Sequence, residues 1–195
     1  MKKILYKLAW KIGILDKISR DRVTILTYHK ILNQLENNDG MEILTMEFEK
    51  QMKFVSENYN LISFEDLING NIKDNSIIIT FDDGYSNFKE NAYPILKKYN
   101  IKPTVFVISG MIGKKDYLSW KDLKEMDIEI GAHTVSHPKL SKIPLEEVEK
   151  ELVESKKVIE NKLKNEVKVL AYPYGLKDDI NEDVIEIAKD NYQIS

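Results

Sequence analysis

Short apolar runs alternate with amphipathic segments along most of this chain. The runs are rich in β-branched and aromatic residues and are apolar at successive positions, a pattern typical of parallel strands buried on both faces. They are VTILTY (23–28), SIIITF (76–81), PTVFVI (103–108), DIEIGA (127–132) and VKVLAY (167–172). The pattern therefore predicts five buried parallel strands.

Segments with helical periodicity separate these runs. Three are residues 45–58, residues 86–99 with Pro94 as an interruption, and the charged stretch PLEEVEKELVESKKVIENKLK, which has Pro144 in its first turn. Two shorter ones start at capping residues, Ser63 with Asp66 three positions on, and Ser119 before residues 120–126. This alternation predicts an α/β fold with a parallel sheet or barrel, whose active site lies at the carboxyl ends of the strands.

The first 22 residues have a different pattern. Their apolar residues follow helical spacing with lysines on the polar side, whereas Lys7 and Lys11 interrupt the apolar stretch and no A-x-A-like cleavage site follows. The pattern does not fit a cleavable signal peptide. We expect an amphipathic helix over 1–22, packed against the domain or touching a membrane surface through residues 1–20, and one domain over 23–195.

Composition narrows the chemistry. The 195 residues are 43% hydrophobic, enough for one sizeable core. The 32 acidic and 29 basic residues are scattered and form no basic stripe, which argues against nucleic acid as a partner. Because the chain contains no cysteine, a metal site has to use nitrogen and oxygen ligands. Nothing in the composition predicts the oligomeric state.

Polar residues follow three of the predicted strands. Asp82, Asp83 and Gly84 come after SIIITF, His133 and His137 come at the end of DIEIGA, and Pro173, Tyr174 and Gly175 come after VKVLAY. An unpaired buried carboxylate is costly, so two adjacent aspartates at the end of a buried strand need water, a metal or a ligand. Three strand ends thus point to one site.

The two histidines of HTVSHP suit a metal centre. Their spacing predicts that both lie on one face of a single helical turn that stops before Pro138. Two neutral imidazoles and one carboxylate bind a divalent cation and leave positions open for water and substrate. Taken singly, DDG is more typical of an Asx turn, and H-x-x-x-H is often two unrelated surface histidines; together, at the ends of predicted strands, they are far more specific. His29, in LTYHKI, is interpreted as a hydrogen-bonded structural histidine rather than a ligand.

TFDDGY, GAHTVSHPKL and AYPYG, in this order, resemble the motifs of the polysaccharide deacetylases of carbohydrate esterase family 4. LTYHKI, LSWKDLKEM and AYPYG are most similar to the branch that includes poly-β-1,6-N-acetylglucosamine deacetylases. The resemblance implies a distorted (β/α) barrel that removes N-acetyl groups from polysaccharide containing N-acetylglucosamine. It also implies a secreted or cell-envelope location.

The resemblance carries roles for individual residues. It implies Asp82 as general base, and Asp83, His133 and His137 as ligands of a divalent cation, zinc first, with cobalt, nickel or iron as alternatives. The backbone N–H of Tyr174 would hold the oxyanion. Substrate contacts are implied for Tyr85, Pro173 and Tyr174.

The chain departs from the family pattern at two points. Ala171 stands where many members have an arginine that orients the catalytic aspartate, and no histidine follows His137 to protonate the leaving amine. We therefore expect a barrel incomplete at its C-terminus, with the late motifs missing. Three hypotheses follow: a metal-dependent N-deacetylase, a non-catalytic or impaired glycan-binding remnant of the same fold, and a deacetylase of another amide or ester.

Overall fold

The centre of the molecule is a parallel sheet. The structure, a computed structural model, describes residues 23–36 and 40–195. Four strands follow the order β1-β5-β6-β7, and β4 (Asn60–Leu61) pairs with the first two residues of β5. The four are β1 (Thr24–Tyr28), β5 (Ser76–Phe81), β6 (Thr104–Val107) and β7 (Glu129–Ala132). Each lies within a predicted run, so four of the five predicted strands are confirmed.

The fifth predicted strand, 167–172, is wrong as a regular strand. The segment forms only two single parallel bridges, from Leu170 to Ala132 of β7 and from Val169 to Ile194. Its backbone hydrogen bonds follow the same pattern, with Leu170 donating to the Ile194 carbonyl and Ala171 to the Ala132 carbonyl. Single bridges on each side give a ladder too short for a regular strand, yet they continue the parallel order beyond β7.

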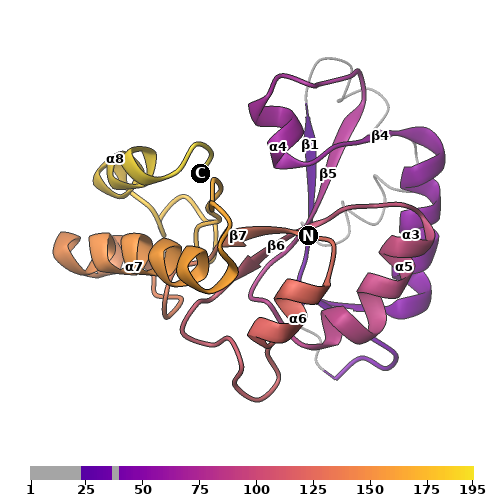
Figure 1. Ribbon diagram of the computed structural model, residues 1–195, viewed down its shortest axis with the longest axis horizontal. Helices are drawn as coiled ribbons and strands as arrows, with labels where there is room; N and C mark the ends of the chain where they lie inside the picture. The colour runs from indigo at the N-terminus through magenta and orange to yellow at the C-terminus, as the bar shows by residue number, and fades with distance from the viewer. Residues whose placement is uncertain (1–22, 37–39) are drawn as a thin grey trace.

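The sheet curves as in a distorted (β/α) barrel. In Figure 1, β6 and β7 run across the direction of β1 and β5, so the strands turn around a common axis. Among the described residues, the recorded pairings do not join β1 to the segment around Ile194. A separate parallel pair, β2 (Lys30–Leu32) with β3 (Glu42–Leu44), follows β1.

Helices cover the outside of this sheet. In Figure 1, α3 (Thr45–Asn58) and α5 (Tyr93–Lys98) lie on one side, and α7 (Leu145–Leu163) and α8 (Glu182–Asn191) on the other. The short helices α4 (Phe64–Ile68) and α6 (Trp120–Glu125) begin at the expected N-caps, Ser63 and Ser119, and each N-cap forms a capping box with the aspartate three positions on. A π-helical turn over Phe88–Ala92 precedes α5, and a 3-10 turn over Leu140–Lys142 precedes α7. Five of these six α-helices lie in predicted helical segments, and α8 does not.

Two prolines are used differently from the prediction. Pro94 stands in the first turn of α5 and so begins that helix, and Pro144 is the N-cap of α7. Proline has no backbone N–H, and at both positions this costs no hydrogen bond because such an N–H would have no partner within the helix. The break expected inside residues 86–99 is thus a junction between the π-helical turn and α5.

An aromatic cluster supports the ends of β1 and β5. Tyr28 stacks on Phe81 with ring centroids 5.5 Å apart, and Phe48 of α3 and Phe88 contact Phe81 edge-on at 5.7 and 4.7 Å. All four rings are buried.

The prediction that every strand is buried on both faces is wrong for β1. Ile25 is 49% exposed, and the strand alternates between covered and exposed positions.

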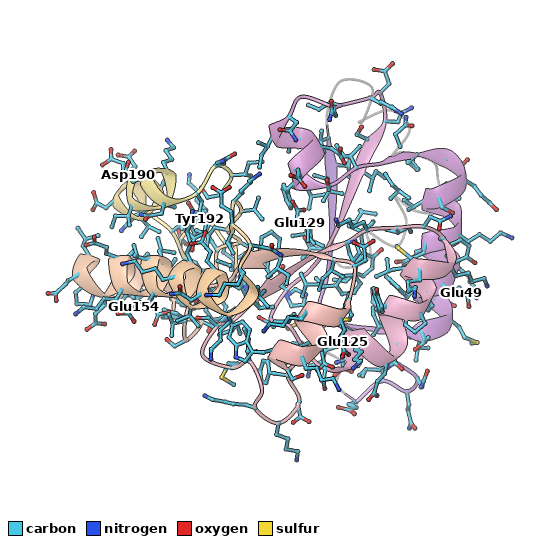
Figure 2. All side chains as sticks on the ribbon, viewed as in Figure 1. Glu49, Glu125, Glu129, Glu154, Asp190 and Tyr192 are labelled. Atoms are coloured by element: carbon cyan, nitrogen blue, oxygen red, sulfur yellow. The ribbon has the colours of Figure 1, made fainter. Side chains whose placement is uncertain are left out.

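Two side chains, both labelled in Figure 2, tie distant elements together. Glu129 at the start of β7 accepts hydrogen bonds from the backbone N–H groups of Phe64 and Glu65, both at 3.0 Å, and so holds the first turn of α4. Tyr192, at the end of α8, donates its hydroxyl to the Leu152 carbonyl of α7 at 2.7 Å. The first contact fixes α4 against β7, and the second fixes α8 against α7.

The N-terminal expectations lie outside the described residues. The helix predicted over 1–22, and its membrane contact, fall in this part of the chain. Within residues 23–36 and 40–195, no helix combines the length and the apolar character that crossing a bilayer requires.

Candidate active site

Two strand ends bring the predicted ligands together. Asp82 extends the β1–β5 pairing by donating its N–H to the Tyr28 carbonyl at 2.9 Å, and Asp83 follows it. His133 directly follows β7, and its N–H donates to the Val107 carbonyl at 3.0 Å. The Nε2 atoms of His133 and His137 lie 3.5 and 3.4 Å from Asp83 Oδ1. One potential ligand atom from each of the three residues lies within 4.8 Å of the others.

The turn after β5 needs glycine. Asp83 and Gly84 both have left-handed backbone, with φ of 70° and 74°. A Cβ on Gly84 would lie 3.0 Å from Val107 Cγ1, so the turn is also pressed against β6. Glycine adopts this conformation without steric cost and leaves room for the neighbouring strand. The turn thereby directs the Asp83 carboxylate toward the two histidines.

The loop from His133 to His137 is not the predicted helical turn. Thr134 and His137 have left-handed backbone, with φ of 65° and 63°, and none of the five residues is helical. The Thr134 hydroxyl accepts a hydrogen bond from the His137 N–H at 3.0 Å, which closes a tight turn. The two imidazoles still converge, with ring centroids 4.8 Å apart. The convergence was predicted correctly, and the backbone that produces it was not.

The donor set fits a divalent cation. His133 Nδ1 lies 2.8 Å from the Ala171 carbonyl oxygen, so this nitrogen carries the proton and Nε2 presents a lone pair toward Asp83. Asp82 Oδ1 and Asp83 Oδ1 are buried and accept no hydrogen bond from any described residue. Buried carboxylate oxygens rarely lack a partner. A cation held by Asp83, His133 and His137 would be the missing partner of the Asp83 carboxylate.

Electrostatics favour the ligating forms of Asp83 and His137, whereas burial, which would lower the pKa of His133, is outweighed by its interactions with Asp83 and Asp82, which raise it. Burial raises the pKa of Asp82, and this effect outweighs the opposing charges of His133 and His29. Burial acts on Asp83 as well, but its interactions with His133 and His137 outweigh burial and lower its pKa. Burial and the charge of His133 lower the pKa of His137. Asp83 is thus favoured as a carboxylate and His137 as a neutral imidazole.

A cavity of about 490 Å³ opens over these groups. Its lining contains Asp82, Asp83, His133, His137, Tyr174 and Gly175, together with Thr27, His29, Met41 and Tyr172. Pro173 and Tyr85, both expected to contact substrate, lie outside this lining, Pro173 buried and Tyr85 half-buried. The cavity therefore combines most of the predicted site with four residues that were not predicted.

His29 is the most informative of the four. Its Nε2 lies 3.9 Å from Asp82 Oδ2, and a quarter of its side chain is exposed. The sequence contained one signal for this placement, since His29 directly follows a predicted strand as the aspartates do. It has no ligand-like spacing to other residues, and it does not belong to the cluster formed by Asp83, His133 and His137.

Tyr174 forms one wall of the cavity. It has left-handed backbone with φ of 66°, the residue is 54% exposed, and the centroid of its ring lies 4.8 Å from that of the His137 ring. Lys139 Nζ lies 5.0 Å from the centre of the Tyr174 ring and 3.0 Å from the buried Asp179 carboxylate. These contacts tie the Tyr174 loop to the segment that follows His137.

A second aromatic group flanks Asp83. Tyr85 and Tyr117 stack with centroids 5.2 Å apart, and Lys30 Nζ lies 4.8 Å from the centre of the Tyr85 ring. Burial and the nearby charge of Asp83 raise the pKa of Tyr85, so its hydroxyl stays protonated at neutral pH. Tyr117, which the sequence did not single out, therefore belongs to the surroundings of the site.

Comparison with known proteins agrees with this geometry. The family model for polysaccharide deacetylases matches residues 69–192, a segment that contains both aspartates, both histidines and Tyr174. The chain belongs to the polysaccharide deacetylase family. The predicted resemblance is thereby confirmed, and so is the distorted barrel, which solved structures of the family share.

Three similar proteins illustrate the relationship. Protein YxkH of Bacillus subtilis (strain 168), whose name assigns it provisionally to the polysaccharide deacetylases, is 32% identical over 183 residues, 89% of this chain and 63% of its own length. The poly-β-1,6-N-acetyl-D-glucosamine N-deacetylase of Staphylococcus aureus is 33% identical over 76% of this chain and 59% of its own. The deacetylase PplD of Streptococcus pyogenes, solved in complex with acetate, superposes with a TM-score of 0.81 at 30% identity, covering 88% of this chain and 81% of PplD. The chain thus spans about three fifths of the length of the two curated relatives.

Proposed function

We propose that this chain removes N-acetyl groups from polysaccharide that contains N-acetylglucosamine, in a reaction that requires a divalent cation. The observation that carries the proposal is the convergence of Asp83, His133 and His137 beside a second buried carboxylate, Asp82, that lies outside the three-residue cluster. The named activity of the Staphylococcus aureus relative supports the substrate class. This class also favours a secreted or cell-envelope location.

Asp83, His133 and His137 would hold the cation, with zinc first and cobalt, nickel or iron as alternatives, since nitrogen and oxygen ligands of this kind suit all four. When bound, the cation supplies a Lewis acid that polarises the amide carbonyl and makes a water molecule a better nucleophile. Holding it requires that Asp83 stay ionised and both histidines stay neutral at Nε2. The hydrogen bond from His133 Nδ1 to the Ala171 carbonyl supports that tautomer.

Asp82 is assigned as the general base. It adjoins Asp83 in the chain, lines the same cavity, and keeps one carboxylate oxygen without a hydrogen-bond donor among the described residues. A carboxylate in this position can take the proton of the attacking water while Asp83 remains with the cation. Asp82 would thereby accept the proton, and Asp83 would hold the cation.

Tyr174 is assigned as the oxyanion donor through its backbone N–H. Its left-handed conformation sets that N–H apart from regular pairing, and no described residue accepts a hydrogen bond from it. A fixed donor at the developing negative charge contributes about 3 to 4 kcal/mol to such reactions. Tyr174 would also contact the substrate through its exposed ring, and Tyr85, two residues after Asp83, is assigned to substrate contact as well.

His29 is assigned as the acid that protonates the leaving amine. It lines the cavity and lies 3.9 Å from Asp82, so a proton donor stands at the reaction centre within the described chain. The family resemblance places such an acid after His137, and His29 is the first candidate for this role among the other residues of the chain. With His29 in this role, the reaction needs no later histidine.

The test uses short N-acetylglucosamine oligomers and protein stripped of metal by chelation. Zinc, cobalt, nickel and iron are supplied in turn, and both released acetate and bound metal are measured. We expect about one cation per chain and acetate release with at least one metal, and Asp83→Asn and His133→Ala should lose both. Equal metal content in wild type and His133→Ala would overturn the metal site. Bound metal without acetate release from any oligomer would instead support the glycan-binding remnant.

A further inference from the structure

The loop between the two histidines has an unusual backbone requirement. Thr134 and His137 both have left-handed backbone, although neither is glycine, and left-handed backbone costs such residues free energy. Neither helix nor strand hydrogen bonds are available to hold this loop. Its polar backbone groups therefore have to be satisfied by neighbouring elements, and those contacts decide whether the loop keeps its shape.

One side of the loop rests on the segment that follows β6. The Ser109 N–H donates to the Thr134 carbonyl, and the Gly110 N–H donates to the Val135 carbonyl, both at 3.0 Å. A Cβ on Gly110 would lie 2.6 Å from the Val135 carbonyl oxygen, so the two backbones are in close contact. These bonds use the carbonyls of Thr134 and Val135, and the N–H groups of Val135 and Ser136 still need acceptors.

Helix α7 supplies the missing acceptor through Glu151. One carboxylate oxygen accepts from the Val135 and Ser136 N–H groups, both at 2.8 Å, and the other accepts from the Ser136 hydroxyl at 2.6 Å. One turn further on, the buried Ser155 hydroxyl donates to the Thr134 carbonyl at 3.0 Å. A single carboxylate thus satisfies two consecutive N–H groups halfway between His133 and His137.

We propose that Glu151 is a positioning residue of the metal centre. It holds the loop between His133 and His137 in the conformation that lets both Nε2 atoms face Asp83. The role rests on the proposed metal site and deepens it, because the hydrogen bonds of Glu151 go to Val135 and Ser136, which lie between the two histidines, and not to the ligands themselves. Its three hydrogen bonds involve an ionised acceptor, the stronger class of hydrogen bond in proteins.

Loss of this support should weaken cation binding more than it weakens the fold. Partners that orient the ligands of a metal typically contribute about 10- to 100-fold in metal affinity. Glu151→Ala leaves two N–H groups without an acceptor and frees the loop to relax away from the converged geometry. We expect it to bind zinc about 10- to 100-fold more weakly than wild type, measured by competition with a chromophoric chelator well below the unfolding temperature.

The conservative variant separates positioning from charge. In Glu151→Gln the amide oxygen can still accept from both N–H groups while the amide nitrogen donates to the Ser136 hydroxyl. We expect this variant to recover most of the affinity that Glu151→Ala loses. The matched control is Glu154→Ala, which removes an exposed carboxylate of the same helix, labelled in Figure 2, and should bind zinc as wild type does.

A measurement on the metal-free protein keeps the inference independent of the proposed function. Amide hydrogen exchange at Val135 and Ser136 should accelerate at least 10-fold in Glu151→Ala and stay unchanged in Glu154→Ala. Wild type that binds no cation would end the proposed function, yet faster exchange would still show that Glu151 holds the loop. Equal zinc affinity in wild type and Glu151→Ala, with wild type binding, would overturn the positioning role. So would equal loss in Glu151→Ala and Glu151→Gln, because charge alone would then explain it.

Discussion

His133 and Ala171 are joined by a 2.8 Å contact between the imidazole Nδ1 and a backbone carbonyl. Because the acceptor belongs to the main chain, the side chain at position 171 takes no part in orienting this histidine. The alanine that departs from the family pattern at this position therefore leaves the histidine tautomer intact. The resemblance implies that an arginine at this position orients the catalytic aspartate; in this chain His29 Nε2 lies 3.9 Å from Asp82 Oδ2.

The two aspartates should respond differently to the same substitution. Asp82→Asn is expected to keep its cation and lose nearly all deacetylation, since the amide cannot accept the proton of the attacking water. Asp83→Asn should lose both, because a ligand is removed. Metal content and acetate release are measured on the same preparations. An Asp82→Asn protein that loses its metal and keeps its turnover would reverse the assigned roles.

His29→Gln tests the leaving-group acid. Removing a general acid lowers the rate by roughly 10²- to 10⁴-fold, and metal content should not change because His29 lies outside the ligand cluster. The control is Tyr172→Phe, which alters the same cavity but removes only a hydroxyl bonded to Ser195. Full turnover in His29→Gln would show that the amine is protonated by another group.

Acid stability should depend on Asp122. Burial alone would raise the pKa of this carboxyl, but hydrogen bonds from Lys89 and Ser119 hold it at about 2, below the ordinary value of 3.8. A carboxyl whose pKa is lowered by folding stabilises the native state above its unfolded pKa and stops doing so as the pH falls through its native pKa. The stabilising effect of Asp122 should therefore be complete above about pH 4 and disappear toward pH 2.

Asp122→Asn provides the comparison. At neutral pH it should be less stable than wild type by up to about 1 kcal/mol, as for a partly exposed pair, and the difference should close between about pH 4 and pH 2. Urea unfolding across this range measures it. The control is Asp190→Asn, at an exposed position of α8. A constant difference down to pH 2 would mean that Asp122 acts through packing or helix capping instead of charge.

Local patterns predicted the framework of this protein well. Buried runs such as SIIITF have few alternatives to a strand, and Ser63 and Ser119 form the capping boxes that their spacing indicates. The strands of one parallel sheet end at the same edge, which is why the DDG turn and the histidines could be assigned to one site. These inferences depend on neighbours in the chain or on a general rule of sheets.

Features that depend on distant contacts were not predictable in the same way. The HTVSHP loop takes its shape from Glu151 and from the segment after β6, so helical spacing alone gave the wrong backbone. His29 reaches Asp82 only because β1 pairs with β5, and no motif records that register. The sequence signal for α8 was its N-cap Asn181, whose side chain accepts a hydrogen bond from the Val184 N–H. The helix was nevertheless not predicted, because it has few apolar positions.

Asp83 comes from the end of β5 and the two histidines from the end of β7, with β6 between them. A cation held by all three would bridge strands that do not pair with each other, and it would bind the native chain in preference to the unfolded one. Folding and metal supply would then be thermodynamically linked, with a gain of about 2.7 kcal/mol at a free metal concentration of 100 times Kd. The melting temperature of this protein would then depend on the free metal concentration of its surroundings as well as on the packing of its core.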